Sequence, residues 1–167
     1  MAKGLGFVIV THGNVGKELL NVASRIMGNK HGDVGSVEVP FTGEMTKKAF
    51  PHCQRPYEQW HRRIARQVIR EVEAVNKGNG VIVLTDILGG TAFNICKRAL
   101  QRGAGVVIAG VNLPMLLKLP SIRTLPLEEA ARNLVARSRK AIDWQLPSSS
   151  EEQDNKMTGT LERCVHN

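Results

Sequence analysis

Three short apolar runs, each followed by turn-forming residues and then by a helical pattern, constrain the fold of this chain more than any other feature. The runs are residues 7–10 (Phe-Val-Ile-Val), 81–84 (Val-Ile-Val-Leu) and 105–110 (Gly-Val-Val-Ile-Ala-Gly). Consecutive apolar residues are typical of a strand that is buried on both faces, as the strands of parallel sheets are. A loosely alternating run at 34–40 ends at Pro40 and suits a fourth strand nearer the edge of the sheet.

Helical patterns separate these runs. Apolar residues recur at helical spacing over 19–27 and 57–75, and again after residues 91 and 112 and over 127–144. Strands that alternate with helices form parallel sheets with right-handed crossovers. The sequence therefore predicts a single-domain α/β fold, an open, mainly parallel, doubly wound sheet with helices on both faces. Residues 122–125 leave room for one brief antiparallel edge strand.

Length and charge divide the chain into two segments. The 167 residues fit one domain with a continuous core, and 42% hydrophobic and 23% charged residues are ordinary for a globular protein. Residues 1–146 hold 21 Lys and Arg against 11 Asp and Glu, whereas residues 147–167 hold two against four. The serines and sparse apolar residues of 147–167 predict a flexible tail after a folded domain over 1–146. Because no secretory or membrane-spanning run is found, we expect a cytoplasmic protein.

Other kinds of site find little support in the residues. Seven aromatic residues, with no basic stripe between them, disfavour nucleic-acid binding and make it a third choice despite the net charge of +8. The three cysteines form no CxxC pair, so neither a disulfide framework nor a zinc site is predicted, and Cys96 reads as a small buried residue. His52, Cys53 and His61 match no known metal-site spacing. We expect no metal and no other cofactor.

His12 stands directly after the first apolar run, at a predicted strand-to-helix turn. In an open parallel sheet, ligands bind outside the carboxyl ends of the strands, where helix N-termini offer amides to anions. His12 could carry a phosphoryl group there, or it could be a turn histidine whose ring bonds a neighbouring carbonyl. A nucleotide-binding P-loop is excluded, because only two residues separate Gly13 from Gly16 and no Ser or Thr follows Lys17.

Two further strand exits carry polar residues. Asp86 follows the run 81–84, and beyond it come two adjacent glycines and Thr91, which can cap the next helix. Asn112 follows the third run. The carboxyl ends of parallel strands lie at one edge of a sheet. His12, Asp86 and Asn112 would therefore meet in a common crevice if the first and third apolar strands were neighbours.

Together, the three exits resemble the mannose-type enzyme IIA family of the bacterial phosphoenolpyruvate-dependent sugar phosphotransferase system. The matching segments are Thr11-His12-Gly13, then Asp86 to Asn94 (Asp-Ile-Leu-Gly-Gly-Thr-Ala-Phe-Asn), then Ala109 to Leu116 (Ala-Gly-Val-Asn-Leu-Pro-Met-Leu). The resemblance extends over about residues 5–144. It is specific, because three motifs occur in order and each stands at a predicted strand exit.

This resemblance implies a phosphocarrier, that is, a phosphotransferase component with a phosphohistidine intermediate. His12 would receive a phosphoryl group from the histidine-containing phosphocarrier protein HPr and pass it to an enzyme IIB component. Asp86 would hold the His12 ring through Nδ1–H and leave Nε2 as the nucleophile. Family members are typically homodimers in which the strand after Pro120 is exchanged or packed between subunits, here residues 122–125. Contact with a membrane would be indirect, through transporter components.

The chemistry of the residues agrees with such a role. A free imidazole, with a pKa of about 6.5, is largely neutral at pH 7, and a carboxylate on one ring nitrogen fixes its tautomer. Positioned donors can then stabilise the transferring phosphoryl group without a metal. The candidate donors are the Thr91 hydroxyl and the backbone amides near Gly13, Asn14 and Gly90. The residues assigned to loop shape or partner contact are Phe93, Asn112 and Pro114.

Several alternatives stay open at this point. Asp86 could simply accept turn amides, and Thr91 could be only a helix cap. The carrier could serve regulation or dihydroxyacetone phosphorylation, and the domain could be a non-catalytic binding module. The segment 41–56 reads longer and more basic than the family pattern, and no enzyme IIB sequence follows residue 146. The sequence therefore defines neither the sugar nor the phosphoryl acceptor.

Overall fold

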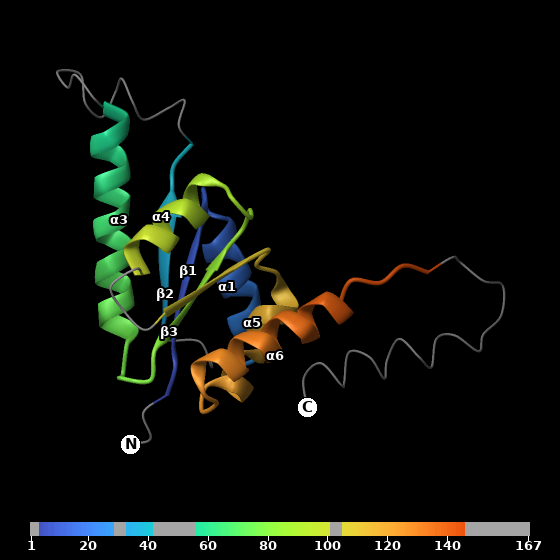
Figure 1. Ribbon diagram of the computed structural model, residues 1–167. Coiled ribbons are helices and arrows are strands. Elements are labelled where there is room, and N and C mark those ends of the chain that lie inside the picture. The colour runs from blue at the N-terminus through green and yellow to red at the C-terminus, as the bar shows by residue number, and fades with distance from the viewer. Residues whose placement is uncertain (1–3, 29–32, 42–55, 101–104, 146–167) are drawn as a thin grey trace, which may run out of the picture.

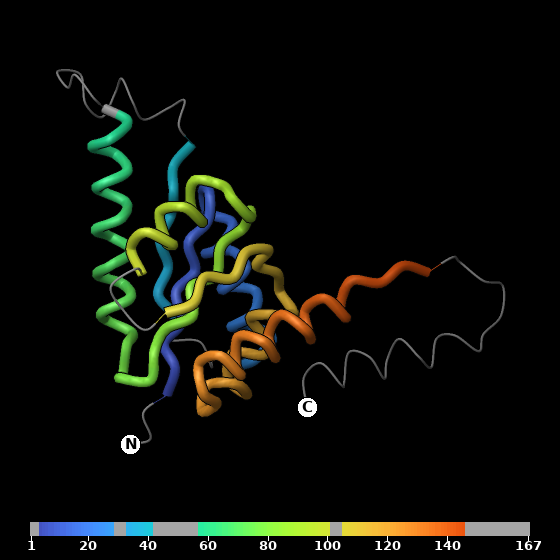
Figure 2. Tube along the Cα trace, viewed as in Figure 1, coloured from blue at the N-terminus to red at the C-terminus, as the bar shows by residue number. Residues whose placement is uncertain are grey.

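The computed structural model describes residues 4–28, 33–41, 56–100 and 105–145 (Figure 1). The chain path is easiest to follow in the tube drawing (Figure 2). In chain order the elements are β1 (Gly6–His12), α1 (Val15–Ile26), β2 (Val34–Val39), α3 (Pro56–Val75), β3 (Val81–Thr85), α4 (Thr91–Ala99), β4 (Gly105–Ala109), α5 (Leu113–Ile122) and α6 (Leu127–Lys140). The predicted helical turn in 46–49, most of the segment 41–56 and the tail 147–167 lie outside the described residues.

The described strands form one four-stranded parallel sheet in the order β2-β1-β3-β4. The first apolar run is β1 and the third is β4, and β3 lies between them. The expectation that these two strands are neighbours is therefore wrong. This strand order still brings His12 and Asp86 together. β1 pairs directly with β3, with Val10 opposite Thr85, so the residues that follow these two strands end up side by side.

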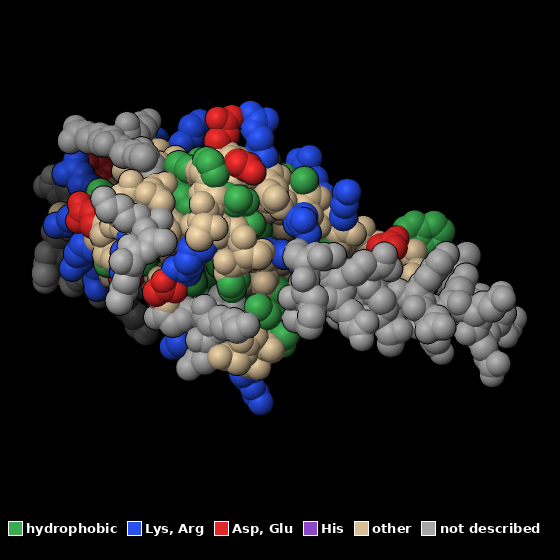
Figure 3. All heavy atoms as spheres, turned by 90° about the horizontal axis from the view of Figure 1, so that it is seen from below, with side chains coloured by type: hydrophobic (Ala, Val, Ile, Leu, Met, Phe, Trp, Pro, Cys, Tyr) green, Lys and Arg blue, Asp and Glu red, His purple; other side chains and the backbone are tan. Residues whose placement is uncertain are grey.

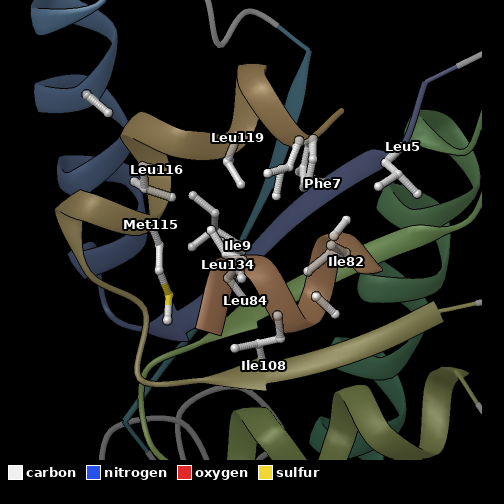
Figure 4. Packing of buried hydrophobic residues seen from close by; sticks show 14 residues of the cluster. Leu5, Phe7, Ile9, Ile82, Leu84, Ile108, Met115, Leu116, Leu119 and Leu134 are labelled. Atoms are coloured by element: carbon white, nitrogen blue, oxygen red, sulfur yellow. The ribbon is translucent and has the colours of Figure 1, made fainter. Parts of the chain in front are cut away.

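Alternate residues of the strands pack against different helices, which explains why the runs are apolar throughout. Phe7 and Ile9 of β1 belong to a core with α1, α5 and α6, whereas Val8 and Val10 belong to a second core with α3 and α4. Figure 4 shows the first core, in which strand residues such as Ile82 and Leu84 lie close to Leu134 of α6. The prediction of a doubly wound α/β sheet with helices on both faces is confirmed.

The predicted edge strand at 122–125 is wrong. Ile122 is the last residue of α5 and is 3% exposed in the first core, and the residues after it form a turn in which the Leu125 N–H donates to the Ile122 carbonyl at 3.1 Å. Proline inside a helix removes a backbone donor and favours a break. Here the burial of Leu119 and Ile122 carries α5 past Pro120. No antiparallel strand occurs among the described residues.

Two helix ends also differ from the sequence pattern. α6 ends at Lys140 instead of continuing to residue 144, and Ile142 and Trp144 beyond it are largely exposed. Gly90, in extended backbone, is the N-cap of α4, so the expectation that Thr91 caps this helix is wrong. No helix in the described ranges is both long enough and apolar enough to cross a membrane.

Candidate functional site

His12 and Asp86 meet at the carboxyl edge of the sheet, at the upper end of β1 and β3 in Figure 1. His12 is the last residue of β1, and Asp86 directly follows β3. The His12 ring nitrogen Nδ1 lies 2.9 Å from Oδ2 of Asp86, and the backbone N–H of His12 donates to the same oxygen at 2.8 Å. Asp86 therefore contacts both the ring and the backbone of His12, which fixes the position of the imidazole.

The second oxygen of Asp86 is engaged as well. Its Oδ1 accepts the backbone N–H of Ile87 at 2.8 Å. Burial by itself raises the pKa of the Asp86 carboxyl, but the N–H of His12, the His12 ring and the N–H of Ile87 together outweigh it. The pKa of Asp86 accordingly lies below its ordinary value, and the residue is an anion at neutral pH. Both interpretations of Asp86, acceptor of turn amides and partner of His12, hold at once.

The His12 ring is only partly covered. The side chain of His12 is 22% exposed and that of Asp86 is 16% exposed. The ring of Phe41, itself 59% exposed, stacks on the His12 ring with centroids 6.2 Å apart and planes at 25°. Phe41 was not predicted as a site residue, because the sequence from residue 41 onward shows no clean apolar period. The signal was its place just after β2, whose Val39 lies opposite His12 in the parallel pair.

The turn from His12 into α1 is held by a buried hydroxyl. Oγ1 of Thr11 accepts the Gly16 N–H at 2.7 Å, and Thr11 is 1% exposed. A Cβ at Gly16 would come within 2.6 Å of Ile9, so only glycine fits this approach of α1 to β1. Gly13 has a φ of +53°, and its N–H donates to the Val39 carbonyl at 3.1 Å. Neither Thr11 nor Gly16 was predicted to have this role, because the contact joins a strand to the helix that follows it.

The groups predicted to donate hydrogen bonds to a phosphoryl group differ in whether they are already paired. The N–H groups of Gly13 and Gly90 already donate to backbone carbonyls, Gly90 to Ile87 at 3.2 Å. Asn14 is the N-cap of α1 and makes no side-chain cap hydrogen bond. Thr91, the first residue of α4, lines a pocket shared with α3. Of the predicted set, the Asn14 amide and the Thr91 hydroxyl remain the better candidates.

The third exit lies one strand further along the same edge. The Gly110 N–H donates to the Asp86 carbonyl at 3.0 Å, which ties the end of β4 to the turn after β3. Asn112 caps α5, because its Oδ1 accepts the Met115 N–H at 3.0 Å, and Pro114 stands in the first turn. Asn112 and Pro114 thus begin α5 directly after the loop that follows β4. Phe93 is half-buried within α4.

Exposed apolar side chains flank the site. In the turn after Asp86, Ile87 is 58% exposed and Leu88 is 77% exposed, and Val15 at the start of α1 is 52% exposed. Figure 3, the view of the opposite end of the molecule, shows apolar side chains near the centre of that face and Lys and Arg side chains around them. The described residues include no group of three or more His, Cys, Asp or Glu side chains that could hold a metal ion. His52 and Cys53 lie outside them.

These features define a class of protein: an open parallel α/β domain that holds a histidine and a carboxylate together at the carboxyl edge of its sheet. A family model described as the fructose IIA component of the phosphotransferase system (PTS) matches residues 56–137. Over these residues the chain is similar to the IIA components of the sugar phosphotransferase system. The matched range contains Asp86 and Asn112, whereas His12 lies before it.

Solved structures with the same fold carry related descriptions. The mannose/sorbose-specific IIA subunit from Enterococcus faecalis is 20% identical, with a TM-score of 0.62 over 87% of this chain and 98% of that chain. The EIIA component from Streptococcus agalactiae is 21% identical, with a TM-score of 0.65 over 84% and 96%. A PTS IIA protein associated with a fucose utilization operon from Streptococcus pneumoniae is 24% identical, with a TM-score of 0.54 over 81% and 93%. No curated protein matches the chain at a significant level.

Proposed function

We propose that the protein is a phosphocarrier that accepts a phosphoryl group from phospho-HPr on Nε2 of His12 and passes it to an enzyme IIB component. The observation that carries the proposal is the 2.9 Å contact between His12 Nδ1 and Asp86 Oδ2. The match of residues 56–137 to the IIA family model supports it. The solved relatives are described as IIA proteins for mannose and sorbose or fucose systems, which favours a role in sugar uptake in the cytoplasm.

The contact with Asp86 selects the tautomer that the transfer requires. An ionised carboxylate can only accept a hydrogen bond, so Nδ1 of His12 carries the ring proton toward Oδ2. In a neutral imidazole the other nitrogen, Nε2, then keeps a free lone pair. The backbone N–H of His12 donates to the same oxygen, so the ring and the chain that carries it are positioned by one group.

The transfer balances without a further reactant. The lone pair on His12 Nε2 attacks phosphorus while the nitrogen–phosphorus bond of phospho-HPr breaks, and the bonding electrons return to the donor imidazole. As His12 becomes phosphorylated, its ring gains positive charge, which the Asp86 carboxylate stabilises at Nδ1. The same steps, reversed, deliver the phosphoryl group to enzyme IIB. Positioning and electrostatics supply the catalysis, and the scheme uses no metal.

The surface around His12 suits two successive protein partners. Phe41 stacks on the ring, and Ile87 and Leu88 follow Asp86 in the turn after β3; all three are exposed apolar side chains, and apolar side chains in the centre of a patch favour protein contact. A single site must accept HPr and then enzyme IIB, and both would cover these residues. We also propose that the protein forms a homodimer, as members of this family typically do. Within one chain, residues 122–125 are the end of α5 and a turn and form no strand.

Phosphate transfer in vitro tests the proposal. Incubation with radiolabelled phosphoenolpyruvate, enzyme I and HPr should add one acid-labile phosphate per chain. His12→Ala should abolish labelling, and Asp86→Asn should slow it by about 10- to 100-fold, the usual loss when a group that orients a functional histidine is removed. His61→Gln is the matched control, since His61 is the other histidine among the described residues, and it should label at the wild-type rate.

The outcomes separate the alternatives. Labelling that persists in His12→Ala would contradict the assignment of His12, and an unlabelled wild-type protein would favour a non-catalytic binding module. Identification of the protein that removes the phosphate from His12 would then distinguish transport from regulation or dihydroxyacetone phosphorylation.

A further inference from the structure

A pocket of about 670 Å³ lies between the N-terminal turns of α3 and the facing side of α4. Tyr57, His61 and Arg62 line it from α3, and Thr91 and Arg98 line it from α4. In Figure 1 these two helices lie side by side on one face of the sheet, and α3 begins near the edge that carries His12. The volume falls in the range of small-molecule sites, and His12 and Asp86 do not line this pocket.

The lining carries a positive charge. Arg62 and Arg98 contribute two guanidinium groups, one from each helix, and Glu58 contributes the one carboxylate of the lining. The pKa of His61 lies below its ordinary value, first because the ring is partly buried and second because of the positive charge of Arg98. The ring is therefore neutral at pH 7 and adds no charge. Guanidinium groups on opposite walls are the arrangement that binds phosphate oxygens well.

Polar groups and one ring complete the pocket. The hydroxyl of Thr91 stands in the first turn of α4, where the helix dipole favours an anion. The amide nitrogen of Asn94, also in the lining, donates to the Gly89 carbonyl at 2.8 Å, which fixes that wall to the turn after Asp86. Tyr57 is 50% exposed, and its ring centroid lies 4.3 Å from that of His61, so an organic group in the pocket could contact the exposed part of the Tyr57 ring.

We propose that this pocket binds a phosphate dianion, free or borne by a small organic molecule, held between Arg62 and Arg98. The inference is independent of phosphoryl transfer at His12, because neither His12 nor Asp86 takes part. Thr91 is the one residue that the two sites could share. A second anion site close to the edge of the sheet would let the concentration of a phosphorylated metabolite act on the carrier directly.

Isothermal titration calorimetry in a phosphate- and sulfate-free buffer tests the proposal. The probes are inorganic phosphate, glucose 6-phosphate and glucose. We expect both phosphates to bind and glucose not to bind, and we expect Arg62→Gln and Arg98→Gln each to weaken binding at least about 10-fold, the usual effect of removing one charge-assisted contact. Arg70→Gln is the matched control, because Arg70 is an exposed arginine of the same helix outside the pocket.

The outcomes divide clearly. Equal affinity for both probes identifies free phosphate as the source, and tighter binding of glucose 6-phosphate identifies an organic phosphate. His12→Ala should leave binding unchanged, which separates this pocket from the phosphoryl-transfer site. Absence of binding, or binding that survives both Arg62→Gln and Arg98→Gln in variants with wild-type circular dichroism, would overturn the proposal.

Discussion

Two buried threonines near the ends of neighbouring strands differ in one respect: the hydroxyl of one makes a hydrogen bond and the hydroxyl of the other makes none among the described residues. Thr11 in β1 and Thr85 in β3 are both almost fully buried. Oγ1 of Thr11 accepts the Gly16 N–H at 2.7 Å, whereas Oγ1 of Thr85 finds no hydrogen-bond partner among the described residues. A hydroxyl that accepts a buried N–H stabilises the fold, and a buried hydroxyl without a partner destabilises it.

Replacement of each threonine by valine, which has nearly the same shape, should therefore have opposite effects. Thr11→Val leaves the Gly16 N–H buried without an acceptor and should lower the free energy of unfolding by about 1–3 kcal/mol. Thr85→Val removes an unsatisfied polar group and should leave that free energy unchanged or raise it. Urea denaturation monitored by circular dichroism measures both. Equal losses in the two variants would show that the hydrogen bond to Gly16 is not the cause.

Asp86 makes a prediction about pH. Its pKa in the folded protein lies below the ordinary value of 3.8, so its ionised form stabilises the fold. This contribution is fully present above pH 3.8 and is lost as the pH falls from there through the folded-state pKa. The difference in unfolding free energy between wild type and Asp86→Asn should thus be larger at pH 5 than at pH 3 and should shrink below about pH 4.

Urea denaturation at pH 7, 5, 4 and 3 measures this difference. Asp143→Asn serves as the control, because Asp143 is exposed beyond the end of α6, and its effect should stay small at every pH. A difference for Asp86→Asn that grew as the pH fell from 5 to 3 would contradict the role assigned to the carboxylate.

At the level of the secondary-structure elements, the long helix α3 is held by one side. Ile64 is 3% exposed and belongs to the core with β1 and β3, whereas Ile69 on the same helix is 39% exposed. Both residues are isoleucines in the interior of one helix, so they share the same helix propensity and differ in burial. They therefore form a matched pair for measuring the contribution of this interface.

Ile64→Ala should lower the free energy of unfolding by about 2–5 kcal/mol, because it removes a buried side chain and leaves a cavity. Ile69→Ala should cost less than about 1 kcal/mol, because much of its side chain is already in water. Thermal and urea unfolding of the two variants measures both losses. A similar cost at the two positions would mean that α3 does not pack on the sheet as described.

The sequence predicted best those elements whose apolar pattern fits only one kind of secondary structure. Four apolar residues in a row, as at 81–84, fit a strand covered on both faces, and the structure confirms it. Residues 122–125 have two readings, since Pro120 suggests the end of a helix and Ile122 suggests a strand. Burial of Ile122 against the first core decides between them, and burial is a property of the fold that local pattern does not contain.

The candidate site shows the same division. His12 and Asp86 could be predicted, because both stand where an apolar run ends. That β3 lies beside β1 could not, since strand order depends on packing between distant segments. The arginines of the α3–α4 pocket were missed for this reason. Arg62 and Arg98 are 36 positions apart in the sequence, and the packing of α3 on α4 places both in the lining of one pocket.

At the scale of the whole molecule, the two faces of the sheet carry different features. The face with α3 and α4 carries the pocket with Arg62 and Arg98, and the face with α1, α5 and α6 carries the larger core (Figure 4). The carboxyl edge between the two faces carries His12 and Asp86. Because the turn after β3 leads directly into α4, the candidate catalytic carboxylate and one wall of the pocket are joined by a single short connection.

The last helix marks where the folded domain should end. Ala130 and Leu134 of α6 are fully buried against the sheet, whereas Ile142 and Trp144, just beyond the helix, are 78% and 76% exposed. A chain that stops after residue 146 should therefore unfold with the same midpoint as the full chain and accept the same phosphate from HPr. A chain that stops after residue 126 loses Leu134 and the packing around it, and this loss is comparable to the whole stability of a domain.

We expect the shorter of these two chains to lack a cooperative unfolding transition and to remain unlabelled. Thermal unfolding by circular dichroism and the phosphoenolpyruvate labelling assay measure both properties for each chain. A lower midpoint for the chain that ends at residue 146 would show that residues 147–167 stabilise the domain. The predicted boundary between a folded domain and a flexible tail would then have to move toward the C-terminus, because burial at Leu134 and exposure at Trp144 would no longer locate it.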